Sequence, residues 1–440
     1  MNLSQRFFVV LGLYAIFLLP VWGQPYRAEN MDASFPDLVK YHFVFSGEKL
    51  QEDVLVVAPS TIYSKNSTFG YDLNSIQKDG KPFFFSVDVP EGNYLVRVVL
   101  GNDKAESVTT VKAESRRLML LNVKNNKGEY SEHFFTVNIR NTKINETESV
   151  RINTREIGKL IWDNKLTLEF NGTNPSVSEI EITQNNNLPV IFLAGNSTVV
   201  DESNEPWCGW GQAFTCFLSP EIVVANHAES GLAAGSFVAQ KRLDKIFMQM
   251  KSGDYLFIEF GHNDQKEQGE GSGPYRSYKT NLKYLVDKTR EKGGIPVLIT
   301  PMHRRNFDNN GKVVNTHGEY PAAMRQLAEE EKVFFIDLHK MSEAFYEAMG
   351  VENSKRAFVH YPKGTFPGQN TDLADNTHFN FYGGYQIAKC ILRGIIDGNI
   401  PLKKYILPQY QNFDPAHPDD VNTFHYPPTP SFKVEKPDGS

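Results

Sequence analysis

The sequence predicts an antiparallel β-sandwich followed by an α/β fold, in which helices cover both faces of a parallel sheet. Apolar runs of strand length with period-two alternation fill the first part of the chain. From residue 188 onward, apolar strands alternate with helical segments. A chain of 440 residues also exceeds the usual size of one hydrophobic core. We therefore expect the sandwich over residues 24–185 and the α/β domain over residues 188–400.

The first 23 residues have the composition of an export signal. Arg6 precedes an apolar run over residues 7–19, which is short for a membrane span. Val21 and Gly23 resemble a signal-peptidase site, so we expect residues 1–23 to be removed and no stable membrane span to remain. An uncleaved anchor is the alternative. Removal takes away one basic and no acidic residue, so the formal charge changes from −6 to −7, which argues against a nucleic-acid partner.

Seven apolar runs rich in Val, Phe and Ile predict the strands of the sandwich. The runs are residues 41–45, 83–89, 94–100, 118–123, 134–139, 166–170 and 177–182. Pro90 and Gly92 mark a turn, because proline presets φ and glycine tolerates positive φ. We expect the aromatic side chains of this region to pack in its core, with sugar-binding platforms as the alternative. They include Phe83, Phe84, Phe85 and Trp162.

Five strands and four helices are predicted in the α/β domain. The strands are residues 189–194, 222–225, 255–260, 296–300 and 333–336. The helices are residues 237–250, 278–291, 320–330 and 381–396. Ligands of such sheets bind beyond the carboxyl ends of the strands. Residues 401–440 are rich in proline and lack an apolar period, so we expect a tail that wraps the surface or is partly disordered.

The chain has three cysteines, Cys208, Cys216 and Cys390. An odd number argues against a disulfide framework as the main source of stability. A bridge between Cys208 and Cys216 and three free thiols both remain open.

A serine and a histidine at two distant positions predict nucleophilic catalysis. Ser197 follows the first strand of the α/β domain and Gly195, which permits a tight turn. A serine hydroxyl needs a base that a third group orients. Asp375 and His378 are three residues apart, and a helical turn or tight loop would put their side chains on one side. Asp372 is a competing carboxylate, and for each motif alone an ordinary turn or helix cap is the alternative.

Two further strand ends carry residues suited to binding an oxyanion. Asn263 follows the third strand, where its amide could donate a hydrogen bond. Gly231 follows the second strand and could present a backbone N–H. Asp264 is expected to hold its loop, and His262 is a weaker alternative to His378 as the base.

These four blocks resemble those of the SGNH (GDSL-like) hydrolases. Their conserved letters fall here on Ser197, Gly231, Asn263 and His378, and the family's aspartate falls on Asp375. The resemblance implies an SGNH-type three-layer fold, with an oxyanion hole formed by the Ser197 and Gly231 N–H groups and the Asn263 amide. The sequence around the serine and the histidine, and the block at residues 205–212, most resemble rhamnogalacturonan acetylesterases of carbohydrate esterase family 12. The sandwich resembles galactose-binding-like modules.

The resemblance implies an esterase that removes acetyl groups from pectic rhamnogalacturonan through an acetyl-serine intermediate. Its partner would be an acetylated plant cell-wall polysaccharide or oligosaccharide, with Trp207, Trp210 and His262 as substrate-binding residues. This chemistry requires neither a cofactor nor a metal. The alternatives are an acetylesterase for xylan or another acyl ester, and a non-catalytic carbohydrate-binding protein on an esterase fold.

One position departs from the family pattern. Asn196 replaces the usual aspartate before the serine, and an amide keeps many of the hydrogen bonds but not the charge. Asn196 also begins a glycosylation sequon beside the proposed nucleophile, where a glycan would block the site. This favours a bacterial host and a periplasmic or secreted protein.

Overall fold

The computed structural model describes residues 39–45, 53–78 and 80–430. The predicted signal peptide, residues 1–23, lies outside the described residues and stays a prediction. Within the described ranges, no helix is both long and apolar enough to cross a bilayer.

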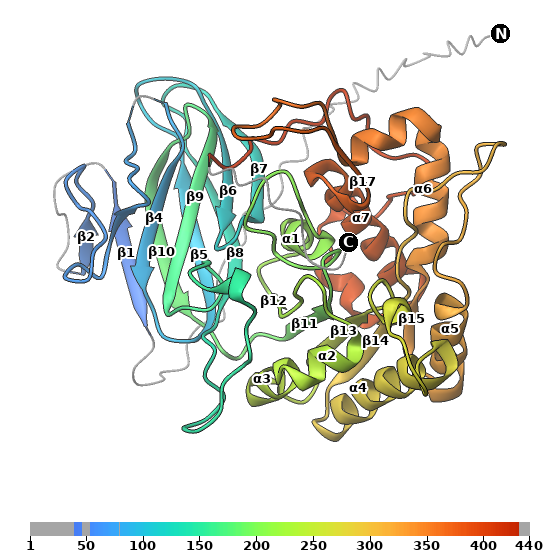
Figure 1. Cartoon of the computed structure of the whole chain (residues 1–440). Coiled ribbons are helices and arrows are strands. Elements are labelled where there is room, and N and C mark those ends of the chain that lie inside the picture. Colours follow the sequence, from blue (N-terminus) through green and yellow to red (C-terminus); the bar gives the residue numbers. More distant parts are fainter. Residues whose placement is uncertain (1–38, 46–52, 79, 431–440) are drawn as a thin grey trace, which may run out of the picture. The chain divides into compact units, whose positions relative to one another are not determined.

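Two five-stranded sheets form the N-terminal sandwich (Figure 1). One sheet has the order β2-β1-β10-β5-β8, and the other has the order β3-β4-β9-β6-β7. Only β1 and β2 pair in parallel among these strands; the other pairs are antiparallel. The strands are β1 Lys40–Val44, β2 Val54–Val56, β3 Phe69–Asp72, β4 Phe83–Asp88, β5 Gly92–Leu100, β6 Ser107–Ala113, β7 Arg117–Asn125, β8 Ser131–Ile139, β9 Lys165–Thr173 and β10 Val177–Gln184. All seven predicted runs are strands, whereas β2, β3 and β6 were not predicted.

Alternate side chains of these strands meet between the two sheets. Phe83 and Phe85 are buried there, and the ring of Phe83 stacks on that of Phe170 with the centroids 5.0 Å apart. Trp162 is half-buried instead of lying in the core. Its indole N–H donates to Glu156 Oε1 at 2.7 Å, and the guanidinium of Arg140 lies 4.7 Å from the centre of its ring. Its ring therefore packs on a buried cation and is not an open sugar platform.

The α/β region contains a five-stranded parallel sheet with the order β12-β11-β13-β14-β15. The strands are β11 Val190–Gly195, β12 Val223–Asn226, β13 Tyr255–Glu259, β14 Ile295–Ile299 and β15 Phe334–Ile336. Each coincides with a predicted strand to within one residue at either end. The predicted fold class is confirmed. From β11 the chain goes to β12 on one side and then crosses back past β11 to β13 on the other, so the carboxyl ends of β11 and β13 are the expected place for a ligand.

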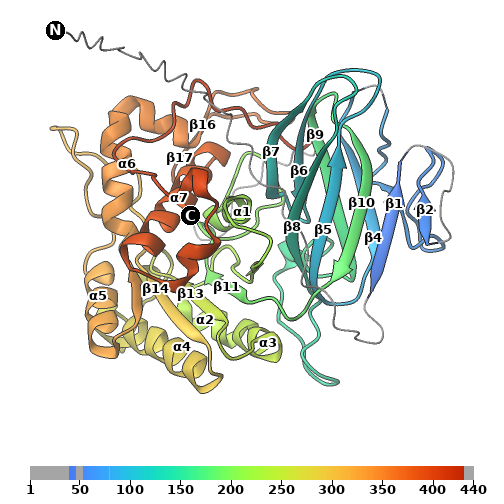
Figure 2. The ribbon, with the colours of Figure 1, turned by 180° about the vertical axis from the view of Figure 1, so that it is seen from behind.

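Helices cover both faces of this sheet (Figures 1 and 2). Ile191 and Leu193 of β11 pack with α1, α6 and α7, while Val190 and Phe192 pack with α2 to α5. The helices are α1 Trp210–Phe214, α2 Ala234–Ala239, α3 Arg242–Gln249, α4 Lys279–Glu291, α5 Tyr320–Glu331, α6 Leu338–Asn353 and α7 Phe381–Asp397. The predicted helix over residues 237–250 is wrong in one respect, because Lys241 with φ 61° separates α2 from α3.

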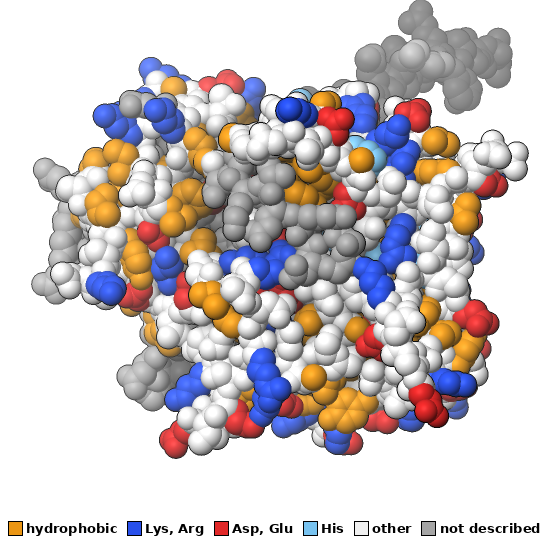
Figure 3. Space-filling view, in the orientation of Figure 1, with side chains coloured by type: hydrophobic (Ala, Val, Ile, Leu, Met, Phe, Trp, Pro, Cys, Tyr) orange, Lys and Arg blue, Asp and Glu red, His pale blue; other side chains and the backbone are white. Residues whose placement is uncertain are grey.

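The turn between β6 and β7 inserts its charged residues into the α/β region. Arg117 is 1% exposed, and its Nε lies 3.0 Å from Asp201 Oδ2. Arg116 donates to the carbonyl of Trp207 at 3.0 Å and pairs with Glu205. These residues support the segment that follows β11. On the face shown in Figure 3, Lys and Arg side chains gather near the middle of the molecule.

The C-terminal tail runs from α7 onto the sandwich. The ring of Tyr426 stacks on Phe381 at 3.5 Å, and the carbonyl of Pro427 accepts from Lys112 Nζ at 2.8 Å. The described part of the tail is therefore bonded to both regions, as expected of a tail that wraps the surface. All three cysteines are free thiols, so the bridge between Cys208 and Cys216 is absent.

Candidate active site

The end of β11 presents a serine at the edge of the sheet. All six residues of β11 are buried, and Gly195 ends the strand. A Cβ at Gly195 would lie 2.5 Å from Val199 Cγ2, so only glycine allows the chain to turn here. The N–H of Val199 donates to the carbonyl of Asn196 at 3.0 Å, which closes the turn around Ser197.

Ser197, His378 and Asp375 form a hydrogen-bonded chain. His378 Nε2 lies 2.9 Å from Ser197 Oγ, and His378 Nδ1 lies 2.8 Å from Asp375 Oδ2. A carboxylate accepts hydrogen bonds, so Nδ1 carries the proton and Nε2 is left to accept from the serine. All three residues are buried: Ser197 is 4% exposed, His378 is 2% exposed and Asp375 is 8% exposed. The structure thus brings together residues 181 positions apart in the geometry of a nucleophile with its base.

A bulge in β17 explains the spacing of Asp375 and His378. The strand, Leu373–Phe379, pairs with β16, Phe358–Tyr361, and the adjacent residues Phe358 and Val359 face Phe379 and Asp375. Without a bulge, residues three apart in a strand would point to opposite faces. Here the intervening residues loop out, which corresponds to the tight loop of the two predicted alternatives.

The same aspartate fixes the bulge from within. Asp375 Oδ1 accepts hydrogen bonds from the N–H groups of Thr377 and His378, at 2.8 and 3.0 Å. Burial alone raises the pKa of Asp375, but its hydrogen bond and charge interaction with His378 and these two N–H groups outweigh burial and lower the pKa to about 2. Asp375 is therefore ionised at neutral pH. The competing Asp372 is exposed and accepts from the N–H of Lys363 at 2.7 Å.

Asn196 makes the acceptor contacts expected of an aspartate. Its Oδ1 accepts from the backbone N–H and the hydroxyl of Thr198, at 3.0 and 2.8 Å. The Thr198 hydroxyl also contacts Glu259 Oε2 at 2.9 Å, and burial raises the pKa of Glu259 to about 8. An aspartate at residue 196 would place a second carboxyl group near this buried one and make ionisation of either less favourable, whereas the amide adds no charge.

The two expected oxyanion donors lie near each other beyond β12 and β13. Gly231 has φ 83°, which favours glycine. Asn263 Nδ2 donates to the carbonyl of Leu232 at 3.1 Å, which places this amide next to Gly231. Asp264 accepts from the N–H groups of Ala234 and Gly261, at 2.9 and 2.8 Å, and so holds the loop as predicted.

The structure corrects the predicted role of the two tryptophans in substrate binding. Trp207 is 2% exposed, and Trp210 is fully buried against Phe214 with ring centroids 5.6 Å apart. After Ser197 the chain turns inward, because the N–H of Trp210 donates to the carbonyl of Thr198 at 2.8 Å. Neither indole face is available to a sugar.

His262 is also buried, at 2% exposed, and belongs to a cluster with His303, His317 and His339. Its ring lies 4.5 Å from that of His317, and neither ring nitrogen has a hydrogen-bond partner among the described residues. Burial lowers the pKa of His303 to about 4 and that of His339 to about 3. Burial lowers the pKa of His262 as well, and the ring nitrogen bonded to Ser197 Oγ is that of His378, so His378 and not His262 is placed as the base. The cluster was not predicted, because its members come from separate segments.

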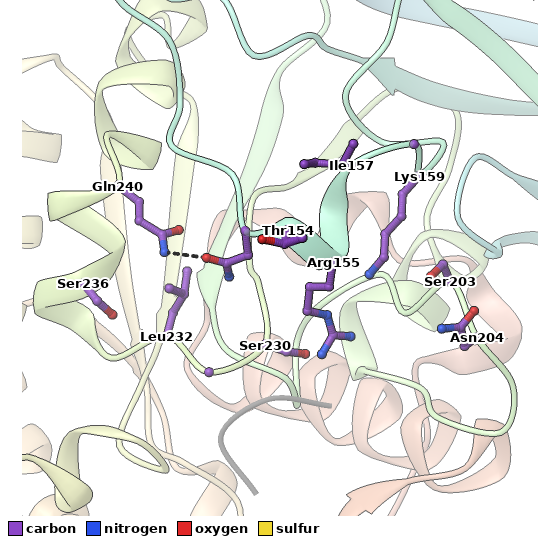
Figure 4. A pocket seen from close by; sticks show the side chains of 13 residues that line it. Thr154, Arg155, Ile157, Lys159, Ser203, Asn204, Ser230, Leu232, Ser236 and Gln240 are labelled. Carbon is purple, nitrogen blue, oxygen red and sulfur yellow. Dashed lines mark hydrogen bonds between the residues drawn. The ribbon is translucent and has the colours of Figure 1, made fainter. Parts of the chain in front are cut away.

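A cavity of about 920 Å³ adjoins Gly231 (Figure 4). Residues 153–159 form one wall, and residues 203–204 and 230–240 form the rest. Its lining also was not predicted, because residues 153–159 read as a polar connection between two strands of the sandwich.

Comparison with known proteins adds the following. The model of the GDSL-like Lipase/Acylhydrolase family matches residues 192–380, which include the serine, aspartate and histidine described above. Rhamnogalacturonan acetylesterase RhgT of Bacillus subtilis is 43% identical over 219 residues, covering 49% of this chain and 94% of that protein. A probable rhamnogalacturonan acetylesterase of the same organism, YesY, is 36% identical over 222 residues, covering 49% and 97%. The uncharacterized esterase YxiM, also of B. subtilis, is 26% identical over 355 residues, covering 74% and 85%.

Proposed function

The chain belongs to the GDSL-like lipase/acylhydrolase family and is a serine carboxylic ester hydrolase, and from this premise we propose that it removes acetyl groups from pectic rhamnogalacturonan. Two relatives that match over nearly their whole length carry the name rhamnogalacturonan acetylesterase, which supports this substrate. The observation that carries the reaction is the chain of contacts from Ser197 through His378 to Asp375.

In the proposed reaction, Ser197 Oγ attacks the acetyl carbonyl while its proton passes to His378 Nε2, which lies 2.9 Å from Oγ. The imidazolium that forms is stabilised by the Asp375 carboxylate. The N–H groups of Ser197 and Gly231 and the amide of Asn263 bind the developing oxyanion. His378 then protonates the sugar oxygen of the breaking ester bond. The sugar departs with a free hydroxyl, and an acetyl-serine remains.

Hydrolysis of this intermediate repeats the steps with water. His378 takes a proton from the water, the hydroxide adds to the acetyl carbon, and acetate leaves as Ser197 regains its proton. Each turnover thus consumes one ester and one water and yields acetate and a free hydroxyl.

Acetate release from acetylated rhamnogalacturonan and acetylated xylan, with wild type and Ser197→Ala, tests the proposal. We expect the wild type to prefer the pectic substrate and Ser197→Ala to lose about 10⁶-fold in kcat. A preference for acetylated xylan would show that xylan, and not rhamnogalacturonan, is the substrate. Acetate release that survives Ser197→Ala would overturn the nucleophile, and binding without turnover by the wild type would identify a carbohydrate-binding protein.

A further inference from the structure

The cavity beside Gly231 has a wall that is fixed before any ligand binds. This wall, residues 153–159, includes the 3₁₀ turn Thr154–Glu156. Glu156 lies 2.5 Å from the guanidinium of Arg242, and Asn153 Oδ1 accepts from Gln240 Nε2 at 3.0 Å. Both partners lie in the α/β region, so the wall is bonded to the part of the chain that carries the serine.

The two cations of this wall are used differently. The guanidinium of Arg155 lies 2.9 Å from the buried carboxylate of Glu202, which engages its charge, and 3.3 Å from Glu229. Lys159, in contrast, has no ion-pair partner among the described residues, and its side chain is half-buried. Figure 4 shows the Arg155 side chain extending toward Ser230 and the Lys159 side chain extending from the same wall, with its nitrogen on the side of Arg155. Burial and the charge of Glu156 raise the pKa of Glu229 to about 8 against the opposing charge of Lys159, so Glu229 is mostly uncharged at neutral pH and leaves the Lys159 charge without an anion.

The remaining lining suits a sugar. Hydroxyl and amide groups dominate it, and they belong to Ser203, Asn204, Ser230, Ser236 and Gln240. Ile157, which is 69% exposed, offers an apolar surface beside them. The volume lies within the range of small-molecule sites. A polar cavity with one unpaired cation selects a ligand that carries hydroxyl groups and one negative charge.

We propose that this cavity is a subsite for a hexuronate unit of the acetylated polysaccharide, with the Lys159 ammonium binding the uronate carboxylate. Gly231 lines the cavity and is also the proposed oxyanion donor, so a uronate bound here lies close to the acetyl group that is removed. This inference rests on the proposed acetylesterase function. It identifies Lys159 as the residue that directs the enzyme to acidic polysaccharides. It also assigns specificity to a segment that lies outside the matched family region, residues 192–380.

Steady-state kinetics on acetylated pectin, and on the same pectin with its carboxyl groups converted to methyl esters, test this subsite. We expect Lys159→Gln to raise KM for the charged pectin about tenfold with a smaller change in kcat, as for loss of one charge contact. Methyl esterification should raise the wild-type KM similarly and change that of Lys159→Gln little. Lys159→Arg should keep the preference for the charged substrate.

Lys127→Gln, at an exposed lysine in the turn between β7 and β8, is the matched control and should match the wild type. The subsite is overturned if Lys159→Gln affects both pectins equally or not at all, or if Lys127→Gln reproduces its effect. A wild type that releases acetate from xylan and none from either pectin overturns the proposed function instead. The two failures are therefore distinguishable.

Discussion

Replacing Asp375 by asparagine should cost far more than one charge. The pKa of about 2 against an ordinary value of 3.8 corresponds to about 2.4 kcal/mol in favour of the carboxylate, at about 1.36 kcal/mol per pH unit. This energy, about 60-fold in an equilibrium constant, is the scale on which the site holds the charge alone. However, the N–H groups of Thr377 and His378 both donate to Asp375 Oδ1. They will hold the amide oxygen of an asparagine there and leave its NH₂ facing His378 Nδ1.

The consequence is the wrong tautomer of His378. An NH₂ group donates, so Nδ1 must accept, and the ring proton moves to Nε2, where it faces Ser197 Oγ. A protonated Nε2 cannot take the serine proton. We therefore expect Asp375→Asn to lose about 10⁴-fold in kcat, as when the triad aspartate of a serine protease is replaced by asparagine.

The assay is single-turnover and steady-state release of acetate, with Asp372→Asn as the matched control. Asp372 is exposed and bonds only the N–H of Lys363 among the described contacts, so its variant should keep kcat within about twofold. The reasoning is refuted if Asp375→Asn keeps more than a tenth of wild-type kcat, or if Asp372→Asn loses as much. The stability that the Asp375 carboxylate adds is fully present above pH 3.8 and is lost as the pH falls through about 2. Any difference in unfolding free energy between wild type and Asp375→Asn at neutral pH should close over that range.

Two further predictions concern the contact between sandwich and α/β region and the thiols. Arg117→Ala leaves Asp201 buried without its cation and should lower the unfolding free energy by about 3–5 kcal/mol in urea denaturation. Arg97→Ala is the control, because the Arg97 side chain is 23% exposed and pairs with carboxylates on the sheet surface. It should lower the unfolding free energy by less than about 1 kcal/mol. Equal losses for the two variants would contradict the importance of the buried Arg117–Asp201 pair. The native protein should react slowly with a thiol reagent, because Cys208 and Cys390 are buried and burial raises the pKa of all three thiols. Three thiols should react when the protein is unfolded. One thiol on unfolding would indicate a disulfide.

The sheet of the α/β region was predictable because its strands are buried on both faces. Such strands read as continuous apolar runs, as in residues 190–195, and their ends could be located to within one residue. Ser197 was predictable because it stands where such a run ends. His378 was predictable because it follows a carboxylate, Asp375, by three residues. Their meeting was an inference from the topology, since parallel strands bring their carboxyl ends to one edge.

The tryptophans and the helix split could not be predicted in the same way. Trp207 and Trp210 follow the serine closely, and proximity in sequence suggested proximity to a sugar. Their burial depends on tertiary contacts, including that of Arg116 with the carbonyl of Trp207. The break at Lys241 also lacks a local signal, because neither glycine nor proline marks it.

The β6–β7 turn shows why the connection between the two regions was not apparent. Glu114, Arg116 and Arg117 read as a solvated charged turn, yet each is less than 7% exposed. Charges buried to this extent require partners. Those of Arg116 and Arg117 are Glu205 and Asp201 of the α/β region.

The same contacts bear on the role of the sandwich. Asp201, the partner of Arg117, also accepts from Asn226 Nδ2 at 2.8 Å, and Asn226 donates to the carbonyl of Val199 at 2.7 Å. A continuous set of bonds therefore runs from the sandwich to the turn that presents Ser197. The sandwich holds this turn in place while residues 153–159 line the neighbouring cavity. A module that only tethered the enzyme to its polysaccharide would need neither arrangement.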